Sequence, residues 1–400
     1  MEPEGRAAAG GGTENHSDRR EGSGMIIINA KAWMDGRFRT DVQVRMAEDR
    51  VTETGEGLTA LPGEEILDLE GDYLLPGFVD VHIHGYQGQD AMRGEEAVRR
   101  MSRGLYRLGV AAFCPTTMSA GPEETRRAAE GIRAVRTRPE LRGARVLGAH
   151  LEAPFLNPEK AGAQRKECFR NPDWAFLEKM TGGTDIVRLI TLAPELPGSE
   201  ALIRRAAAAG IHVSVGHTAA DAETVHRAAE WGADHVTHTF NAQSPLNHRA
   251  PGVPGAALTD DRLICELICD GVHLHPDIIR LALRCKGAEK IAAITDAMEA
   301  AGMPDGSYSL GGQKVLVRQG EARLEDGTLA GSVLTMPQAM ENLIHRWGIS
   351  PEEACAMCTS SPAASVGEEK AGRILPGSPA PLTRWSGGWR MKGILPEIRD

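Results

Sequence analysis

From about residue 74 onward, short apolar stretches alternate with longer stretches in which apolar residues recur every three or four positions. The first pattern predicts buried strands and the second predicts amphipathic helices. Eight predicted strands end near His84, Thr117, Glu152, Glu195, Thr218, Phe240, His273 and Met298. Predicted helices cover 94–108, 122–138, 199–209, 219–231 and 276–285, and a turn-rich excursion over 303–332 precedes two more over 336–347 and 351–358. Strand ends spaced by 22 to 43 residues suit consecutive βα units, and eight such units predict a closed (β/α)8 barrel of the TIM type.

The two ends of the chain carry a different pattern. Residues 25–73 are typical of short strands joined by tight turns, with a hairpin signal at Asp35-Gly36. Residues 372–400 again suggest strands and turns, but their apolar content is too thin for a separate domain. We therefore expect 25–73 and 372–400 to form one small β-sandwich domain beside a barrel over 74–371. Residues 1–24 lack an apolar period and are expected to be a disordered tail.

Composition and charge narrow the classes of protein. The 400 residues carry a net charge of −10, so binding to nucleic acid is not expected. No run of 18 apolar residues is present, so no membrane-spanning helix is predicted. The N-terminus lacks the apolar core of a signal peptide, and seven scattered cysteines fit a reducing compartment. We expect a cytoplasmic protein that acts on a small molecule.

Histidines and carboxylates gather at the predicted strand ends. They are His82, His84, His150, His217, His238 and His273, six of the 13 histidines, together with Glu152 and Asp296. Because the carboxyl ends of barrel strands form one face, these side chains are expected to converge there as a metal site. His82 and His84 are two residues apart on one strand and share a face. His235 is an odd number of residues from His238, so we expect it to face outward.

Two imidazoles and one carboxylate, from His217, His238 and Glu152, can make a three-ligand metal site with open positions for water. Asp296 follows a buried strand and can act as the acid/base beside that metal. Structural alternatives stay open at this point. Glu152 or Asp296 can instead cap a helix, and the His82–His84 pair can be packing in a polar barrel.

A set of ordered motifs carries a resemblance to a known family. They are Pro76-Gly77-Phe78-Val79-Asp80-Val81-His82-Ile83-His84-Gly85, His150-Leu151-Glu152, Gly216-His217-Thr218, Thr237-His238-Thr239-Phe240-Asn241-Ala242, His248-Arg249, Cys269-Asp270-Gly271-Val272-His273, Ile294-Thr295-Asp296-Ala297 and Leu329-Ala330-Gly331-Ser332. In this order and over about residues 25–390, the chain resembles the N-acetylglucosamine-6-phosphate deacetylases, a branch of the metal-dependent amidohydrolases.

The resemblance implies a role for each matching residue. Glu152, His217 and His238 would hold the main divalent metal, and His82 with His84 would match a second site that only some members keep. Asp296 would be the acid/base residue, and His273 would contact the acetyl carbonyl oxygen. The substrate-binding set would be Ala163, Gln164, Asn241, Ala242, His248, Arg249, Asp270, His273, Leu329, Ala330 and Gly331. Zinc or iron is the expected metal, with one ion held tightly and a second one possible.

The implied reaction is hydrolysis of the N-acetyl group of N-acetylglucosamine 6-phosphate, which gives glucosamine 6-phosphate and acetate. The implied assembly is a homodimer in which the phosphate-binding arginine reaches the neighbouring subunit. The chain departs from the family pattern mainly around the substrate, at Ala153, Gln164, Gln243, Asn247 and Ala250. Two rival interpretations therefore stay open: a deacetylase of another N-acyl amino sugar, and a barrel that serves as a non-catalytic scaffold.

Overall fold

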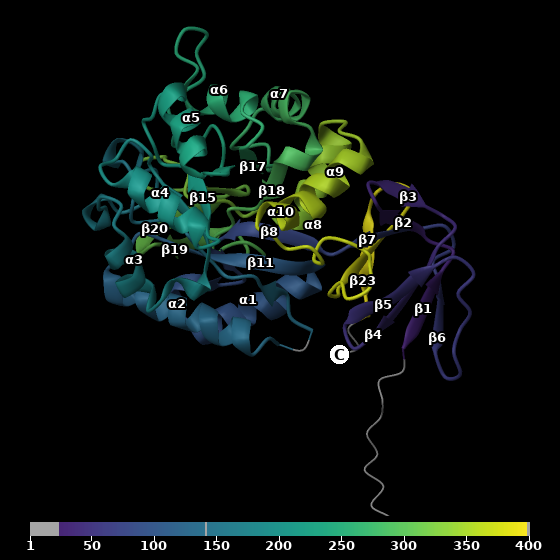
Figure 1. Ribbon diagram of the computed structural model, residues 1–400. Helices are drawn as coiled ribbons and strands as arrows, with labels where there is room; N and C mark the ends of the chain where they lie inside the picture. Colours follow the sequence, from purple (N-terminus) through teal and green to yellow (C-terminus); the bar gives the residue numbers. More distant parts are fainter. Residues whose placement is uncertain (1–23, 141, 398–400) are drawn as a thin grey trace, which may run out of the picture.

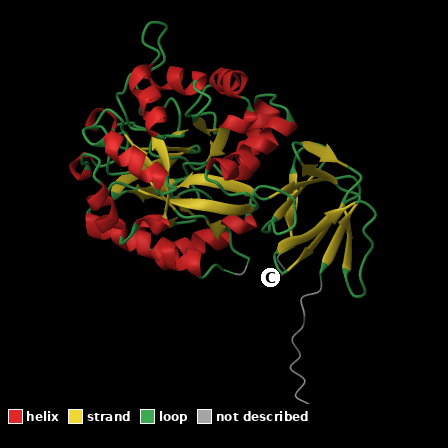
Figure 2. Ribbon diagram, viewed as in Figure 1, coloured by secondary structure: helices red, strands yellow, loops and turns green. Residues whose placement is uncertain are grey.

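A computed structural model describes residues 24–140 and 142–397. Within these ranges, eight parallel strands follow one another around a barrel, as predicted (Figure 1). They are β8 (Phe78–Ile83), β11 (Val110–Thr117), β13 (Ala149–Leu151), β14 (Val187–Leu192), β15 (His212–Val215), β16 (His235–Val236), β17 (Ile264–Ile268) and β18 (Ile291–Ile294). Their side chains are almost all buried, as expected for parallel strands covered by helices (Figure 2). The short strands β9 (Gly85–Tyr86), β10 (Gln89–Asp90) and β12 (Arg145–Val146) flank them.

Helices surround the barrel, most of them where the apolar period of the sequence predicts them. They are α1 (Glu95–Arg107), α2 (Pro122–Thr137), α3 (Trp174–Thr181), α4 (Ser199–Ala208), α5 (Ala222–Trp231), α6 (Gly252–Thr259), α7 (Pro276–Lys286), α8 (Met336–Glu341) with a π-helix at Asn342–Arg346, α9 (Pro351–Cys358) and α10 (Ser360–Ser365). Single 3-10 turns lie at Ala91–Arg93, Pro158–Lys160, Lys166–Cys168, Thr184–Ile186 and Ala288–Lys290. Sequence patterning overlooked α3, α6 and α10, which have six to eight residues and therefore few turns in which to show a period, although it identified the equally short α9.

The barrel closes through side-chain and backbone hydrogen bonds between its first strand and the residues that directly follow its last strand. Backbone ladder pairing links β8 only to β11 among the described strands, while β18 pairs with β17. The Asp80 carboxylate of β8 instead accepts a hydrogen bond from the Thr295 hydroxyl at 2.6 Å, and the Asp296 N–H donates to the His82 carbonyl at 2.9 Å. Burial raises the pKa of Asp80 to about 7. These contacts hold His82 beside Asp296.

A small domain of two sheets combines the two ends of the chain (Figure 1). One sheet has the order β5 (Arg50–Gly55), β4 (Gln43–Ala47), β1 (Met25–Ile28), β6 (Glu65–Asp68), and the other has the order β23 (Met391–Leu395), β22 (Leu382–Trp385), β7 (Tyr73–Pro76), β2 (Lys31–Met34), β3 (Arg37–Arg39). Ile27, Val44, Leu74 and Leu382 belong to the apolar core that the two sheets share. The predicted sandwich is confirmed. The boundary between the small domain and the barrel at residues 73/74 stays a prediction, since β7 crosses it. The predicted tail over 1–24 falls almost entirely outside the described residues.

The excursion over 303–332 forms a sheet of its own rather than a string of turns. Its strands β19 (Gly306–Leu310), β20 (Gln313–Arg318) and β21 (Glu321–Arg323) pair antiparallel. Leu310, Val315 and Val317 pack with Met118 and Met298 from the barrel loops in a separate apolar cluster. This sheet thereby covers one side of the barrel mouth. None of the helices in the described ranges has the length and apolarity needed to cross a membrane.

Candidate metal centre and substrate pocket

The carboxyl ends of the barrel strands open into a cavity of about 320 Å³, a volume typical of small-molecule sites. Most of the predicted site residues line it: His84, Glu152, Ala163, Gln164, His217, His238, Asn241, Ala242, His273, Asp296, Leu329 and Gly331. His82 lies directly beneath them, fully buried. Sequence reasoning missed other lining residues, namely Met118, Glu159, Lys160, Gly162, Ile268, Leu310 and Thr328. Met118 directly follows a predicted strand end, which was the signal that could have identified it.

Three ligand-type atoms form a compact triangle at the base of this cavity. Glu152 Oε1 lies 3.1 Å from Nε2 of both His217 and His238, and the two Nε2 atoms lie 3.1 Å apart. His217 Nδ1 lies 2.8 Å from the Lys160 carbonyl, which can only accept, so Nδ1 donates to it and Nε2 is the ring nitrogen that faces Glu152. A cation placed between this nitrogen and the carboxylate would be bound by both. Ligands about 2.0–2.1 Å from a tetrahedral ion are about 3.3 Å apart, so the triangle fits a divalent metal.

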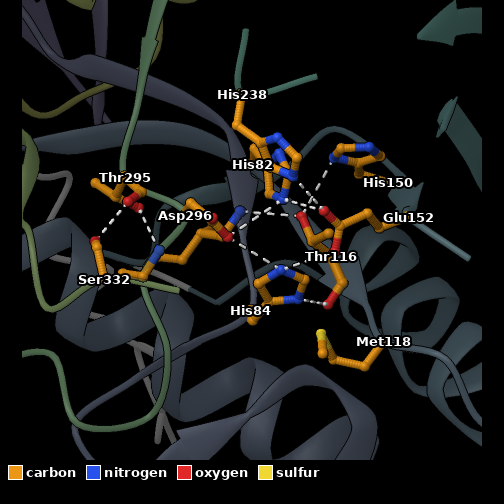
Figure 3. Close-up of polar contacts among 12 residues, drawn as sticks. His82, His84, Thr116, Met118, His150, Glu152, His238, Thr295, Asp296 and Ser332 are labelled. Carbon is orange, nitrogen blue, oxygen red and sulfur yellow. Dashed lines mark hydrogen bonds and ion pairs between the residues drawn. The ribbon is translucent and has the colours of Figure 1, made fainter. Parts of the chain in front are cut away.

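A second group of ligand-type atoms shares Glu152 with the first. His84 Nε2 lies 3.2 Å from Glu152 Oε2 and 3.2 Å from Asp296 Oδ1, as Figure 3 shows. His82 Nε2 lies 3.4 Å from Glu152 Oε1 and from Asp296 Oδ1, and it has no hydrogen-bond partner among the described residues. His84 Nδ1 lies 3.2 Å from the Thr116 carbonyl and can donate to it, so Nε2 is the ring nitrogen that a metal ion would bind in place of a proton. These separations again match the edges of a metal site.

The two carboxyl groups between the histidines are held in their charged form. Burial favours neutral Glu152, but the surrounding histidines, His82 foremost, hold the pKa of this carboxyl well below its ordinary value. The same balance lowers the pKa of Asp296, where burial is again outweighed by His82 and His84. Burial opposes protonation of His84, but its contacts with Asp296 and Glu152 raise its pKa to about 9. Both carboxylates are thus available to a cation at neutral pH.

The backbone at three of these residues is strained. His217, His238 and Asp296 have φ angles of 47°, 27° and 48°, in the left-handed region that non-glycine residues rarely occupy. Each lies just beyond the end of its strand, where the chain turns into the following loop. Such conformations cost on the order of 1–3 kcal/mol each and cluster at functional sites. They aim all three side chains into the cavity.

Two histidines do not lie where the sequence predicted. His150 was expected at the mouth, but it lies one layer deeper, with Nε2 2.8 Å from the Thr191 hydroxyl. His235 was expected to face outward, but it faces the barrel interior. It pairs in register with Ser214 on the neighbouring strand, and the Ser214 hydroxyl contacts the buried Thr237 hydroxyl. The parity count failed because β16 ends at residue 236, before the turn that carries His238.

His235 belongs to another histidine–aspartate group, at the amino ends of the strands. Asp234 accepts hydrogen bonds from Nδ1 of His212 at 2.6 Å and of His235 at 2.7 Å. These separations are shorter than the edges of a common metal site, and they fit protons shared between ring and carboxylate. The geometry of the His212–Asp234–His235 group therefore indicates hydrogen bonding rather than a further metal site.

The remaining predicted site residues do not line the cavity. Asp270 supports the pocket, because its Oδ2 accepts from His273 Nδ1 at 2.7 Å. Ala330 is fully buried in the cluster under the 306–323 sheet. His248 and Arg249 are exposed on the loop between β16 and α6, which projects from the body of the molecule, and neither lines the cavity (Figure 1).

Comparisons with known proteins place this pocket in context. Residues 73–399 match the Amidohydrolase family. The N-acetylgalactosamine-6-phosphate deacetylase of Escherichia coli O157:H7 is 34% identical over 371 residues, 92% of this chain and 95% of the relative. The N-acetylglucosamine-6-phosphate deacetylase of Bacillus subtilis (strain 168) is 43% identical over 276 residues, 68% and 69% of the two chains. A mutant N-acetyl-D-glucosamine-6-phosphate deacetylase from Mycobacterium smegmatis, solved in complex with N-acetyl-D-glucosamine-6-phosphate, has a TM-score of 0.85 and 31% identity over 94% of this chain and 98% of that chain.

Proposed function

The chain belongs to the amidohydrolase family, and we propose that it hydrolyses the N-acetyl group of N-acetylglucosamine 6-phosphate, giving glucosamine 6-phosphate and acetate. The observation that carries the proposal is the joined pair of imidazole–carboxylate groups at the base of the pocket. The relatives that match most of the chain are named as deacetylases of N-acetylhexosamine 6-phosphates, and such hydrolysis needs a site of this kind.

Glu152, His217 and His238 would hold the main metal, and His82 and His84, with Glu152 and Asp296, the second. A divalent ion supplies Lewis-acid chemistry there: it lowers the pKa of water and polarises a carbonyl group. Imidazole and carboxylate ligands suit zinc or iron. Gln164 positions Glu152, because its side-chain amide donates to Glu152 Oε2 and its carbonyl accepts from the Ser119 N–H at 2.7 Å.

Asp296 and His273 carry the proton transfers and the oxyanion contact in this proposal. Ionised Asp296 accepts the proton of the attacking water and then returns it to the departing amine. The Asp270 carboxylate accepts from His273 Nδ1 at 2.7 Å and so fixes the orientation of the ring. Nε2 of that ring would donate to the acetyl oxygen as negative charge develops on it.

N-acetylgalactosamine 6-phosphate is the second candidate substrate, because a relative named for that sugar matches 92% of this chain. Of the departures from the family pattern at Ala153, Gln164, Gln243, Asn247 and Ala250, Gln164 is the one that lines the cavity. One of them is structural: Gln243 is buried, donates to the Thr237 carbonyl at 2.8 Å and accepts from the Phe240 N–H at 3.0 Å. It therefore braces the turn that carries His238 and leaves the sugar to be selected by other residues.

The test is acetate release from both 6-phosphorylated sugars and from unphosphorylated N-acetylglucosamine, with metal analysis of the same sample. We expect metal-dependent release and the highest kcat/KM on N-acetylglucosamine 6-phosphate. A higher kcat/KM on the galactosamine sugar would transfer the assignment to that substrate. No release from any of the three by metal-loaded protein would favour the scaffold interpretation.

Replacing Arg249 by Ala is expected to raise KM for the 6-phosphorylated substrate by about 10- to 150-fold. A charge-assisted bond to a phosphate contributes on the order of 1.5–3 kcal/mol, and the phosphate is remote from the amide, so kcat should change little. Arg249→Lys keeps the charge but loses the planar guanidinium group, so its KM should lie between those of the wild type and Arg249→Ala. Steady-state kinetics with and without the 6-phosphate provide the check. Equal losses on both substrates would make Arg249 structural.

A homodimer and a cytoplasmic setting are part of the proposal. Arg249 lies outside the cavity of its own subunit, on an exposed loop that also carries Leu246, 45% exposed, so it can reach a neighbouring copy. All seven cysteines fall in the described ranges and are free thiols, which fits a reducing compartment. Sedimentation measurements of the intact protein test the dimer.

A further inference from the structure

Glu266 is a fully buried carboxylate on β17, beneath the metal centre. Its Oε2 accepts hydrogen bonds from His82 Nδ1 at 3.0 Å and from the His238 backbone N–H at 3.2 Å. Its Oε1 has no partner among the described residues. A carboxylate buried away from water is costly unless a positive charge lies nearby. The structure thus raises the question of what Glu266 does there.

The contact with His82 fixes the state of that ring. A carboxylate oxygen accepts, so Nδ1 keeps its proton and Nε2 is the ring nitrogen whose lone pair a metal ion would take in place of a proton. That lone pair lies 3.4 Å from Glu152 Oε1 and from Asp296 Oδ1, in the second group of ligand atoms. Without Glu266, the ring could take the other tautomer or rotate, and the lone pair would be lost to the site.

The two histidines of the second group are supported differently. His84 donates from Nδ1 to a neutral backbone carbonyl of Thr116, whereas His82 donates to a charged carboxylate. A carboxylate behind an imidazole makes the ring a stronger metal ligand, and loss of such a contact lowers metal affinity by about 10- to 100-fold. His238, a ligand residue of the first group, meets Glu266 only through its backbone N–H.

We propose that Glu266 is a positioning residue that sets the affinity of the second metal site through His82. The inference rests on the proposed metal-dependent function. Glu266 adds a negative charge beneath the centre and holds the His82 lone pair toward Glu152 and Asp296. Its effect falls mainly on the second site, because the first site gains only a backbone contact from it.

Glu266→Gln is the informative variant, because the amide keeps the shape and can keep an oxygen in the Oε2 position while losing the charge. We expect the second metal to bind about 10-fold more weakly in Glu266→Gln, and up to about 100-fold more weakly in Glu266→Ala. The first metal should stay bound in both. Metal content after equilibration at a series of free zinc concentrations, with circular dichroism to check the fold, measures this directly.

Two controls make the result specific. Asp234→Asn alters another carboxylate that holds histidine Nδ1 atoms, at the opposite end of the barrel, and should leave both metal affinities unchanged. In a His82→Ala background, Glu266→Gln should have no further effect on metal content, because Glu266 acts through His82. Unchanged binding of the second metal in folded Glu266→Gln and Glu266→Ala, or an equal loss of both metals, would overturn the inference. Wild-type protein that binds no metal at all would instead refute the proposed function.

Discussion

Replacing Asp296 by Asn is expected to lower turnover by at least about 10²-fold while the fold and the tight metal are retained. The neighbouring histidines hold the pKa of Asp296 below its ordinary value, so this carboxylate is ionised and ready to accept a proton. An amide has nearly the same shape and can keep an oxygen near His84 Nε2, but it cannot accept the proton. The loss should therefore appear in kcat for acetate release, with little change in KM.

Asp221→Asn provides the matched control. Asp221 caps α5 by accepting from the Thr224 N–H at 2.8 Å, is exposed and does not line the cavity, and Asn caps a helix equally well. The control variant should keep both turnover and melting temperature. If Asp296→Asn had the same turnover as Asp221→Asn, another group would have to accept the proton of the attacking water. The role of Asp296 would then be limited to holding the second metal.

The barrel could be predicted from the sequence because each βα unit carries local signals. In α1, Val98, Met101 and Leu105 are buried at the spacing that predicted a helix. In α2, Pro122 and Glu124 mark the first turn, and the helix begins there. The small domain could also be anticipated, since strands at both ends of the chain had no other partners. The short helices and the 306–323 sheet depend on tertiary packing, which no local pattern reveals.

The orientation of single residues was predicted less well, and the reason is visible at His238. Counting faces by alternate residues works where the backbone stays extended, and it correctly paired His82 with His84, which directly follows β8. His238 lies after β16, with a φ of 27° that no residue type in Thr237-His238-Thr239 signals. Counting back from it therefore gave His235 the wrong face. His217 and Asp296 have similar backbones, so their convergence on the cavity was correct for a reason that the sequence did not show.

The sequence of one strand carries a signal for Glu266. It is the one charged residue within the apolar run over 264–268. A carboxylate in a strand that is otherwise buried on both faces must have a partner, because an isolated buried charge is too costly. The signal was present in the sequence, but its partners, His82 and His238, lie 184 and 28 residues away. Only the barrel topology brings them together.

The two groups of ligand atoms share one carboxylate. Glu152 Oε1 faces His217 and His238, whereas its Oε2 faces His84, so this residue belongs to both groups. Glu152→Ala should therefore lose both metals and at least about 10³-fold in turnover, since Lewis-acid stabilisation contributes several kcal/mol. Elemental analysis and acetate release measure the two effects on one sample.

The matched control for Glu152→Ala is His82→Ala combined with His84→Ala, which should remove only the second metal. The first group keeps its three ligand atoms in that double variant, and two nearby cations repel each other, so the second ion is expected to bind more weakly from the start. Wild-type protein should thus hold one metal per chain tightly and fill the second site only at higher metal concentration. If the double variant lost all its metal while Glu152→Ala kept one ion, His82 and His84 would be the primary ligands and Glu152 would serve the outer site.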